Sequence, residues 1–239
     1  MPTNFAKYLS LQEEYPELFV NPTGEAVIEV ISDPAQIKKG EKNIKNQLSQ
    51  EGKPKNWGNI GVLVDDPWFF VIRDLVRFPD GNLGRYIRVV NRKGLRGGTN
   101  VVILPTYKGK VLLIEQFRHS LRDWAWELPR GFGESGISAK GNVEKELEEE
   151  IGEHSLIDLV YLGETYPNSG ILGEKVSYYF VEIDDFEAKS LPNTAHVEGI
   201  SGIKLFSLNE FKRMILENDL QDSFALNAYL MANLKGLLD

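Results

Sequence analysis

The stretch Gly131–Glu153, GFGESGISAKGNVEKELEEEIGE, joins a glycine-containing loop to a segment that is rich in glutamate. In the second half of this stretch, Val143, Leu147 and Ile151 recur at every fourth position. That spacing places the three side chains on one face of a helix. The sequence therefore predicts a short helix that packs an apolar face on a core and carries acidic side chains elsewhere.

The glutamates of this helix suggest a site for a cation. Glu146 and Glu150 are four residues apart, and Glu149 follows Glu146 by three, so the three carboxylates share one side of one turn. Hard divalent ions such as Mg²⁺ prefer oxygen ligands and keep coordination positions for water and substrate phosphate. Taken alone, the run of glutamates favours a solvated acidic helix, because charge runs usually face water. The residues before the helix favour the cation site.

Those residues resemble the motif of a known family. WELPRG (Trp126–Gly131) leads into the loop, and Lys145-Glu146-Leu147, Glu149-Glu150 and Gly152 follow Gly131 at fixed distances. This pattern is similar to the Nudix box, Gly-x5-Glu-x7-Arg-Glu-apolar-x-Glu-Glu-x-Gly-apolar, and aligns with it without a gap. The preceding run, Val111–Gly131, resembles the ADP-ribose pyrophosphatase branch of that family. The resemblance implies a Nudix-type fold and a metal-dependent pyrophosphohydrolase.

The chain departs from the box at three positions. Ile137 stands where the box has Glu, Lys145 where it has Arg, and Glu153 where it has an apolar residue. In the family, the Arg steadies the neighbouring catalytic carboxylate and the loop acid. Lysine keeps the charge but lacks the planar fork that holds two oxygens. The loss of both the acid and the Arg is consistent with replacement of the pair as a unit, and equally with a site that has decayed.

Composition excludes several other classes of protein. The 239 residues suffice for one large domain, or for a core with a smaller appendage, and their 42% hydrophobic and 26% charged content is typical of a globular protein. No stretch has the apolar length of a membrane span, and the N-terminus does not resemble a signal peptide. The absence of Cys fits a reducing cytoplasm. A net charge of −8 argues against a general nucleic-acid binder.

The N-terminal region, residues 1–98, is predicted to be a smaller α+β region. Helices are expected at 10–19 and 33–50, and a hairpin at 68–78 and 84–92 around Pro79-Asp80-Gly81. In the ADP-ribose pyrophosphatase branch, a similar sheet helps to form a homodimer and supplies an aromatic that stacks on adenine. The resemblance implies this role for Trp57 or Trp68. The alternative for either tryptophan is simple packing in a core or an interface.

The second region, residues 99–239, is predicted to be the Nudix domain. Its expected strands and helices give a mixed sheet with helices on both faces, an α/β/α sandwich. The expected strands are 101–105, 111–117, 156–166, 175–183 and 203–208, and the expected C-terminal helices are 209–217 and 222–238.

The candidate metal ligands are Glu146 and Glu150, with Glu149 as a third carboxylate that either binds the ion or supports it through water. The resemblance adds the backbone carbonyl of Arg130 as an oxygen ligand. It also implies a loop carboxylate as general base or ligand. Glu174 lies in PNSGILGE (Pro167–Glu174), which resembles the SPGxxxE loop of the ADP-ribose pyrophosphatases. Glu164 is the alternative.

Arginine is the residue expected to bind substrate phosphates. Arg118 follows Glu115-Gln116-Phe117, as does the Arg that contacts substrate in similar proteins. Arg122 and Arg130 are weaker candidates, and His119 is interpreted as structural. The chain has no Walker loop and no GxGxxG fingerprint, which disfavours a P-loop enzyme or a dinucleotide-dependent oxidoreductase.

Three hypotheses follow. The first is a hydrolase that depends on Mg²⁺ or Mn²⁺ and cleaves the diphosphate of a nucleoside diphosphate derivative, with ADP-ribose or a nucleotide sugar as the expected substrate class. The second is a Nudix-shaped module that binds a nucleotide sugar with weak or no hydrolysis, which Ile137 and Lys145 favour. The third is a hydrolase of another nucleoside diphosphate derivative. No nucleic-acid or membrane partner is expected.

Overall fold

The computed structural model describes residues 3–186 and 191–238. The chain divides into two compact units. The first unit contains Met1–Leu95 and Asn168–Glu174, and the second contains Arg96–Pro167 and Lys175–Asp239. The expected boundary at 98/99 lies close to the first break. Asn168–Glu174, which that boundary assigned to the second region, clusters with the first unit.

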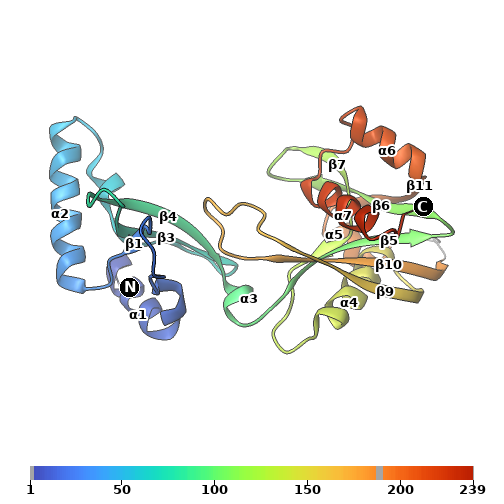
Figure 1. The fold of residues 1–239 in the computed structure, drawn as a ribbon, viewed down its shortest axis with the longest axis horizontal. Helices are drawn as coiled ribbons and strands as arrows, with labels where there is room; N and C mark the ends of the chain where they lie inside the picture. Colours follow the sequence, from blue (N-terminus) through green and yellow to red (C-terminus); the bar gives the residue numbers. More distant parts are fainter. Residues whose placement is uncertain (1–2, 187–190, 239) are drawn as a thin grey trace. The chain divides into compact units, whose positions relative to one another are not determined.

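The first unit is built on a small antiparallel sheet (Figure 1). Its central strand β3 pairs with β4 along its whole length on one side, and with β2 and β1 on the other. The elements of this unit are α1 (Asn4–Glu14), a 3₁₀ turn (Pro16–Phe19), β1 (Glu29–Val30), α2 (Pro34–Gln50), a second 3₁₀ turn (Lys55–Gly58), β2 (Gly61–Asp65), β3 (Phe69–Arg77), β4 (Leu83–Asn91) and α3 (Arg92–Leu95).

A buried polar network fastens the N-terminal segment to this sheet. The Tyr8 hydroxyl of α1 donates to Asp74 of β3 over 2.6 Å, and Arg88 of β4 donates two further hydrogen bonds to the same carboxylate. Arg88 also donates to the carbonyl of Leu18. Burial, followed by the charge of Asp74, raises the pKa of Tyr8 far above its ordinary value. Tyr8 therefore stays neutral and acts as a donor.

The segment Asn168–Glu174 attaches to strand β4 within the first unit. The amide of Val89 donates to the carbonyl of Ile171 over 2.8 Å, and the Tyr86 hydroxyl donates to the carbonyl of Gly170 over 3.0 Å. The amide of Asn91 donates to the carboxylate of Glu174 over 2.5 Å. These contacts satisfy part of the outer edge of β4.

The second unit contains a mixed seven-stranded sheet. Five of its strands follow one another in the order β11-β6-β5-β10-β9, and the short strands β7 and β8 pair with β6 and β5. Strand β10 runs parallel to β5 and antiparallel to β9. The elements of this unit are β5 (Asn100–Tyr107), β6 (Lys110–Arg118), β7 (Asp123–Glu127), β8 (Arg130–Gly131), α4 (Ala139–Ile151), β9 (His154–Thr165), β10 (Val176–Phe186), α5 (Asn193–Val197), β11 (Ile200–Ser207), α6 (Leu208–Leu216) and α7 (Ser223–Leu234).

Helices cover both faces of this sheet (Figure 1). On one face, Val143, Leu147 and Ile151 of α4 and Ala195 of α5 pack in a core that includes Ile103 and similar strand residues. On the other face, side chains of α6 and α7 pack in a second core. Because β-strand side chains alternate between the two faces, the five strands β5, β6, β9, β10 and β11 contribute to both cores. The predicted α/β/α sandwich is confirmed.

The sheet opens where the candidate site lies. Strands β5 and β6 pair only beside their connecting turn, through Thr106 with Val111 and Tyr107 with Lys110. Beyond this point, β7 pairs with β6, and β8 pairs with β5. The two added strands fill the gap between β5 and β6, and they bring Glu127, Arg130 and Gly131 to the middle of the sheet.

The expected elements match the structure, with shifted ends. The predicted hairpin of the first region and the strands of the second region are present, and α6 and α7 lie at the expected positions. The predicted helix 10–19 is wrong in its bounds: α1 begins after the Thr3 cap, and Pro16 separates it from a 3₁₀ turn. The short β1, β2, β7 and β8 were not foreseen, because their two to five residues are defined by pairing and not by periodicity.

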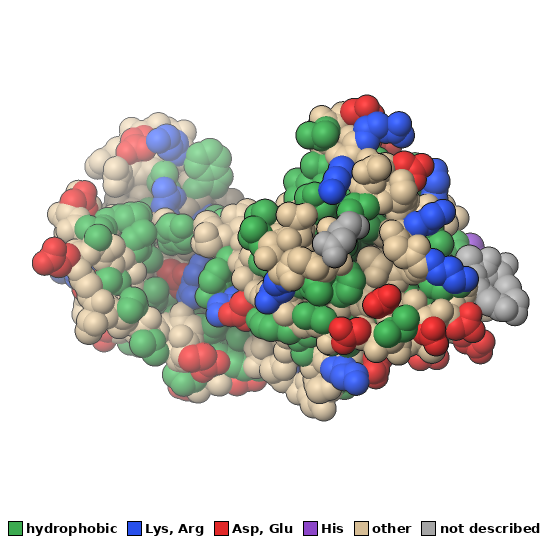
Figure 2. Space-filling model, turned by 45° about the vertical axis from the view of Figure 1, so that its right-hand side comes forward, with side chains coloured by type: hydrophobic (Ala, Val, Ile, Leu, Met, Phe, Trp, Pro, Cys, Tyr) green, Lys and Arg blue, Asp and Glu red, His purple; other side chains and the backbone are tan. Residues whose placement is uncertain are grey.

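The surface carries the acidic excess that the composition implies. Figure 2 shows several Asp and Glu side chains close together at the lower right of the visible face. In the described part of the chain, no helix combines the length and the apolar character that a bilayer crossing requires.

Candidate functional site

Helix α4 carries the candidate site on its inner side. The Ser138 hydroxyl caps the helix by accepting from the amide of Gly141, and Gly152 ends it with a φ of +88°. Positive φ favours glycine, so a helix end at this position follows from the sequence.

A buried polar row runs along α4 beside its apolar face. Asn142, Glu146 and Glu150 follow one another at intervals of four residues, with exposed fractions of 1%, 7% and 1%. Carboxylates are seldom buried this deeply unless a cation or hydrogen-bond donors accompany them. Glu149 lies beside the row and is half-buried, so Glu146 and Glu150 form the inner pair.

The loop from Arg130 to Glu134 covers this row. The amide of Arg130 donates to Glu150 over 3.2 Å, and the amide of Glu134 donates to the Asn142 side chain over 3.3 Å. Between them, Gly131 faces Glu146: a Cβ atom added to Gly131 would overlap its carboxylate. The loop backbone and the acidic side chains of α4 are therefore packed directly together.

Burial and neighbouring charge shape the acidity of Glu150. Burial is the main cause that raises its pKa well above the ordinary value, and the negative charges of Glu146 and Glu198 add to it. The hydrogen bond from Arg130 and the charge of Arg118 act in the opposite direction. A divalent cation between Glu146 and Glu150 would offset both burial and repulsion.

The donor set fits a hard divalent cation that retains other ligands. Two buried carboxylates offer the oxygen atoms that Mg²⁺ prefers. Among the described residues, no three acidic or histidine side chains converge closely enough to form a complete metal site. Glu146 and Glu150 would therefore share a cation with backbone, water or phosphate oxygens, as is usual for Mg²⁺.

Two arginines meet at a buried carboxylate next to this site. Arg118 donates from both Nε and Nη2 to one oxygen of Glu127, and Arg130 donates to the same oxygen over 2.5 Å. Arg130 also donates, over 2.8 Å, to Asp222, which caps the N-terminus of α7. The network fixes both guanidinium groups while leaving Arg118 partly exposed. Arg122, in contrast, is exposed and contacts His119.

The substituted box positions have distinct surroundings. The Lys145 ammonium donates to Glu134 over 2.5 Å and lies 3.6 Å from Glu149. The hydrogen bond to Glu134, followed by the charge of Glu149, raises the pKa of Lys145. Ile137 packs beside Gly141, where its Cγ2 lies 2.9 Å from the position that a Cβ would take. The loop acid that contacts Lys145 is thus Glu134.

The other predicted site residues lie elsewhere in the chain. Glu174 belongs to the first unit, where it binds the amide of Asn91. Trp68 and Trp57 also belong to that unit, and both are exposed. Glu164, the alternative to Glu174, lies on β9 and pairs with Lys175. The roles assigned to these residues remain predictions from the family resemblance.

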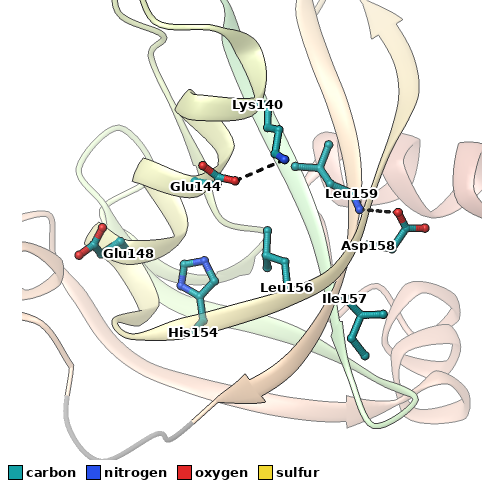
Figure 3. Close-up of a pocket in the computed structure, with 8 residues that line it drawn as sticks. All are labelled: Lys140, Glu144, Glu148, His154, Leu156, Ile157, Asp158 and Leu159. Carbon is teal, nitrogen blue, oxygen red and sulfur yellow. Dashed lines mark hydrogen bonds and ion pairs between the residues drawn. The ribbon is translucent and has the colours of Figure 1, made fainter.

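A groove of about 610 Å³ lies on the opposite side of α4 from Glu146 and Glu150. Figure 3 shows Glu144 and Glu148 on the helix and His154 on β9 at its wall, with an ion pair between Lys140 and Glu144. Each helical residue advances by about 100°, so Glu144 and Glu148 point about 160° away from Glu146. The groove is therefore separate from the carboxylate site.

Sequence reasoning missed four residues of this region. Asn142 and Glu134 hold the loop on α4, Glu127 orients the arginines, and the charge of Glu198 acts on Glu150. For Asn142 the available signal was its place four residues before Glu146. Glu127 lies in the quoted WELPRG run, as does its partner Arg130, but its other partner, Arg118, comes from β6. No local pattern identifies Glu198.

Comparisons with known proteins agree with this geometry. The family model for the NUDIX domain matches residues 95–226, more than half of the chain. No curated protein matches the chain. The crystal structure of an ADP compounds hydrolase is similar to it, with a TM-score of 0.62, 19% sequence identity, and coverage of 74% of this chain and 92% of the other. The loop, the acidic helix and the matched family model together establish that this chain belongs to the Nudix hydrolase superfamily.

Proposed function

We propose that this protein is a divalent-metal-dependent hydrolase that cleaves the diphosphate of a nucleoside diphosphate linked to another group. The observation that carries the proposal is the pair of buried carboxylates, Glu146 and Glu150, packed under the loop Arg130–Gly131. Burying two like charges side by side is costly in a protein that never holds a cation there.

The proposed ligands are Glu146 and Glu150, with the carbonyl of Arg130 as a further oxygen donor and with Glu149 either binding the ion or supporting it through water. A bound divalent ion would neutralise phosphate charge and lower the pKa of a water molecule. Mg²⁺ is the proposed physiological ion, with Mn²⁺ as a substitute, since both favour oxygen ligands.

The remaining groups of the chain would orient the substrate and accept a proton. Arg118 is partly exposed and held by Glu127, which suits it to bind a diphosphate oxygen. Hydrolysis forms a bond from water oxygen to phosphorus and breaks the bond to the leaving phosphate. The proton lost by water passes to a carboxylate, for which Glu149 and Glu174 are the candidates.

The proposed substrate class is ADP-ribose or a nucleotide sugar. The likeness of the fold to that of an ADP compounds hydrolase supports an ADP-containing substrate. Family resemblance further supports a homodimer in which Trp68 stacks on the base. Stacking of an exposed tryptophan on a purine buries apolar surface on both partners.

A second candidate function is a binding module that senses a nucleotide sugar. Its support is the absence of an acid at position 137 and of an arginine at position 145. The contact between Lys145 and Glu134 weakens that support, because a cation and an acid are still joined at this corner of the loop.

The deciding experiment is a substrate panel with and without metal. Purified protein would be incubated with ADP-ribose, ADP-glucose, NAD and a nucleoside triphosphate, in Mg²⁺, in Mn²⁺ and in chelator, with nucleotide products separated by chromatography. Metal-dependent AMP from ADP-ribose or ADP-glucose is the expected result. Calorimetric binding without any product would favour the sensor, and neither binding nor product would contradict the proposal.

A further inference from the structure

The loop before α4 makes a tight turn around Glu134. The carbonyl of Glu134 accepts from the amide of Ile137 over 3.3 Å, and Gly136 at the third position of the turn has a φ of +82°. The amide of Glu134 donates to the buried side chain of Asn142. The backbone of Glu134 is therefore held by two hydrogen bonds, one at its carbonyl and one at its amide. These bonds restrain the position from which its side chain extends.

The side chain of Glu134 meets Lys145 on the helix. Lys145 donates to Glu134 over 2.5 Å and lies 3.6 Å from the carboxylate of Glu149. One cation thus lies between an acid of the loop and an acid of the helix. Without Lys145, the charged neighbour of Glu149 one turn before it on the helix would be Glu146, and like charges three residues apart repel.

We infer that Glu134, Lys145 and Glu149 form a clamp in which Glu134 holds Lys145 so that Lys145 positions the Glu149 carboxylate against the loop. The inference rests on the proposed function, because its purpose is to orient a carboxylate of the hydrolytic site. Glu134 and Lys145 are positioning residues. In this chain the acid and the base of the box have been replaced as a unit. Lys145 stands in place of the arginine, and Glu134 supplies the acid three residues before the box position. Ile137, at the box position itself, packs on Gly141.

The first test compares single and double neutral variants. Glu134→Gln and Lys145→Gln should each lower kcat by about 10- to 100-fold, the scale on which small misplacement of a reacting group acts, with little change in KM. The double variant should lose about as much as either single variant, because both break one unit. Lys145→Arg should retain most of the activity. The matched control is Glu144→Gln, which breaks the exposed pair with Lys140 on the same helix.

The second test separates the loop contact from the contact with Glu149. Exchanging the charges, Glu134→Lys with Lys145→Glu, restores the attraction between loop and helix but places an acid beside Glu149. The clamp predicts that this double variant recovers the contact between loop and helix but does not recover kcat. Full recovery of kcat would overturn the part assigned to Glu149.

Hydrogen exchange gives a measurement that does not depend on activity. In metal-free protein, peptides covering residues 131–138 should exchange faster in Lys145→Gln than in wild type, and should be unchanged in Glu144→Gln. If wild type hydrolyses nothing in the panel but exchange follows this pattern, the proposed function and the part assigned to Glu149 fail, and the contact between Glu134 and Lys145 that holds the loop remains. If wild type is active, and Lys145→Gln changes neither exchange nor kcat, the clamp is wrong.

Discussion

Gly131 lies directly against the carboxylate of Glu146, with no space between them for a Cβ atom. The amide of the preceding residue, Arg130, donates to Glu150. Two consecutive loop residues, Arg130 and Gly131, thus contact the two buried carboxylates of α4, Glu150 and Glu146. The glycine at the start of the motif is required by this close approach, since its φ is not positive.

Substitution of Gly131 by alanine should therefore move the loop or Glu146. We expect kcat/KM of Gly131→Ala to fall by about 100-fold, the effect that roughly 1 Å of misplacement can have. Steady-state kinetics on the best substrate of the panel measures it. Gly202→Ala is the control, because a Cβ at that position meets nothing within 4 Å. An active Gly131→Ala would show that the close contact does not define the site.

Replacement of Glu150 should separate catalysis from stability. Burial, with Glu146 and Glu198, raises the pKa of Glu150 in the folded chain. Between the ordinary glutamate pKa and this raised value, the folded chain holds more protons than the unfolded chain. The free energy of unfolding therefore falls as the pH rises through that window. Glu150→Gln has no proton to lose, so its stability should fall less.

The measurement is thermal unfolding in chelator from pH 5 to pH 8. Glu150→Gln should unfold about 2–4 °C above wild type at the upper end, the shift that about 1 kcal/mol gives in a chain near this length. Its hydrolytic activity in Mg²⁺ should be lost. A variant with full activity, or with the same pH dependence as wild type, contradicts the assignment of Glu150.

Arg118 is expected to bind the diphosphate through its guanidinium. Arg118→Lys keeps the charge but lacks the planar group that donates to Glu127 while its remaining nitrogen can contact a phosphate oxygen. KM should rise by about 10-fold, equivalent to about 1.4 kcal/mol of binding, while the fold is unchanged by circular dichroism. Arg213→Lys, at an exposed arginine on α6, should leave KM unaltered. An unchanged KM in Arg118→Lys would assign the phosphate contact to another residue.

Glu127 should matter for stability as well as for substrate binding. Its buried carboxylate accepts from Arg118 and Arg130, and Gln in its place removes the charge that both arginines face. Hydrogen bonds to charged groups are worth about 1.5–3 kcal/mol. We expect Glu127→Gln to lower the free energy of unfolding by about 2 kcal/mol in urea denaturation, and to raise KM. Unchanged values for both would exclude an orienting role.

The sequence by itself determined the acidic helix, its capped and glycine-terminated ends, and the layered α/β class. These features depend on neighbours within a few residues: the apolar repeat of Val143, Leu147 and Ile151 selects one helix face. The same repeat places Glu146 and Glu150 beside that face, so their burial next to the core follows from local geometry.

The tertiary structure decided which distant groups meet those acids. Glu127 gains Arg118 through the pairing of β6 with β7, and Arg130 reaches Asp222 at the start of α7. Glu134 reaches Lys145 only because a turn reverses the loop, so an acid at an unexpected position contacts the helix. Side-chain identity and spacing encode local periodicity, whereas contacts between residues far apart depend on how strands pair and loops close.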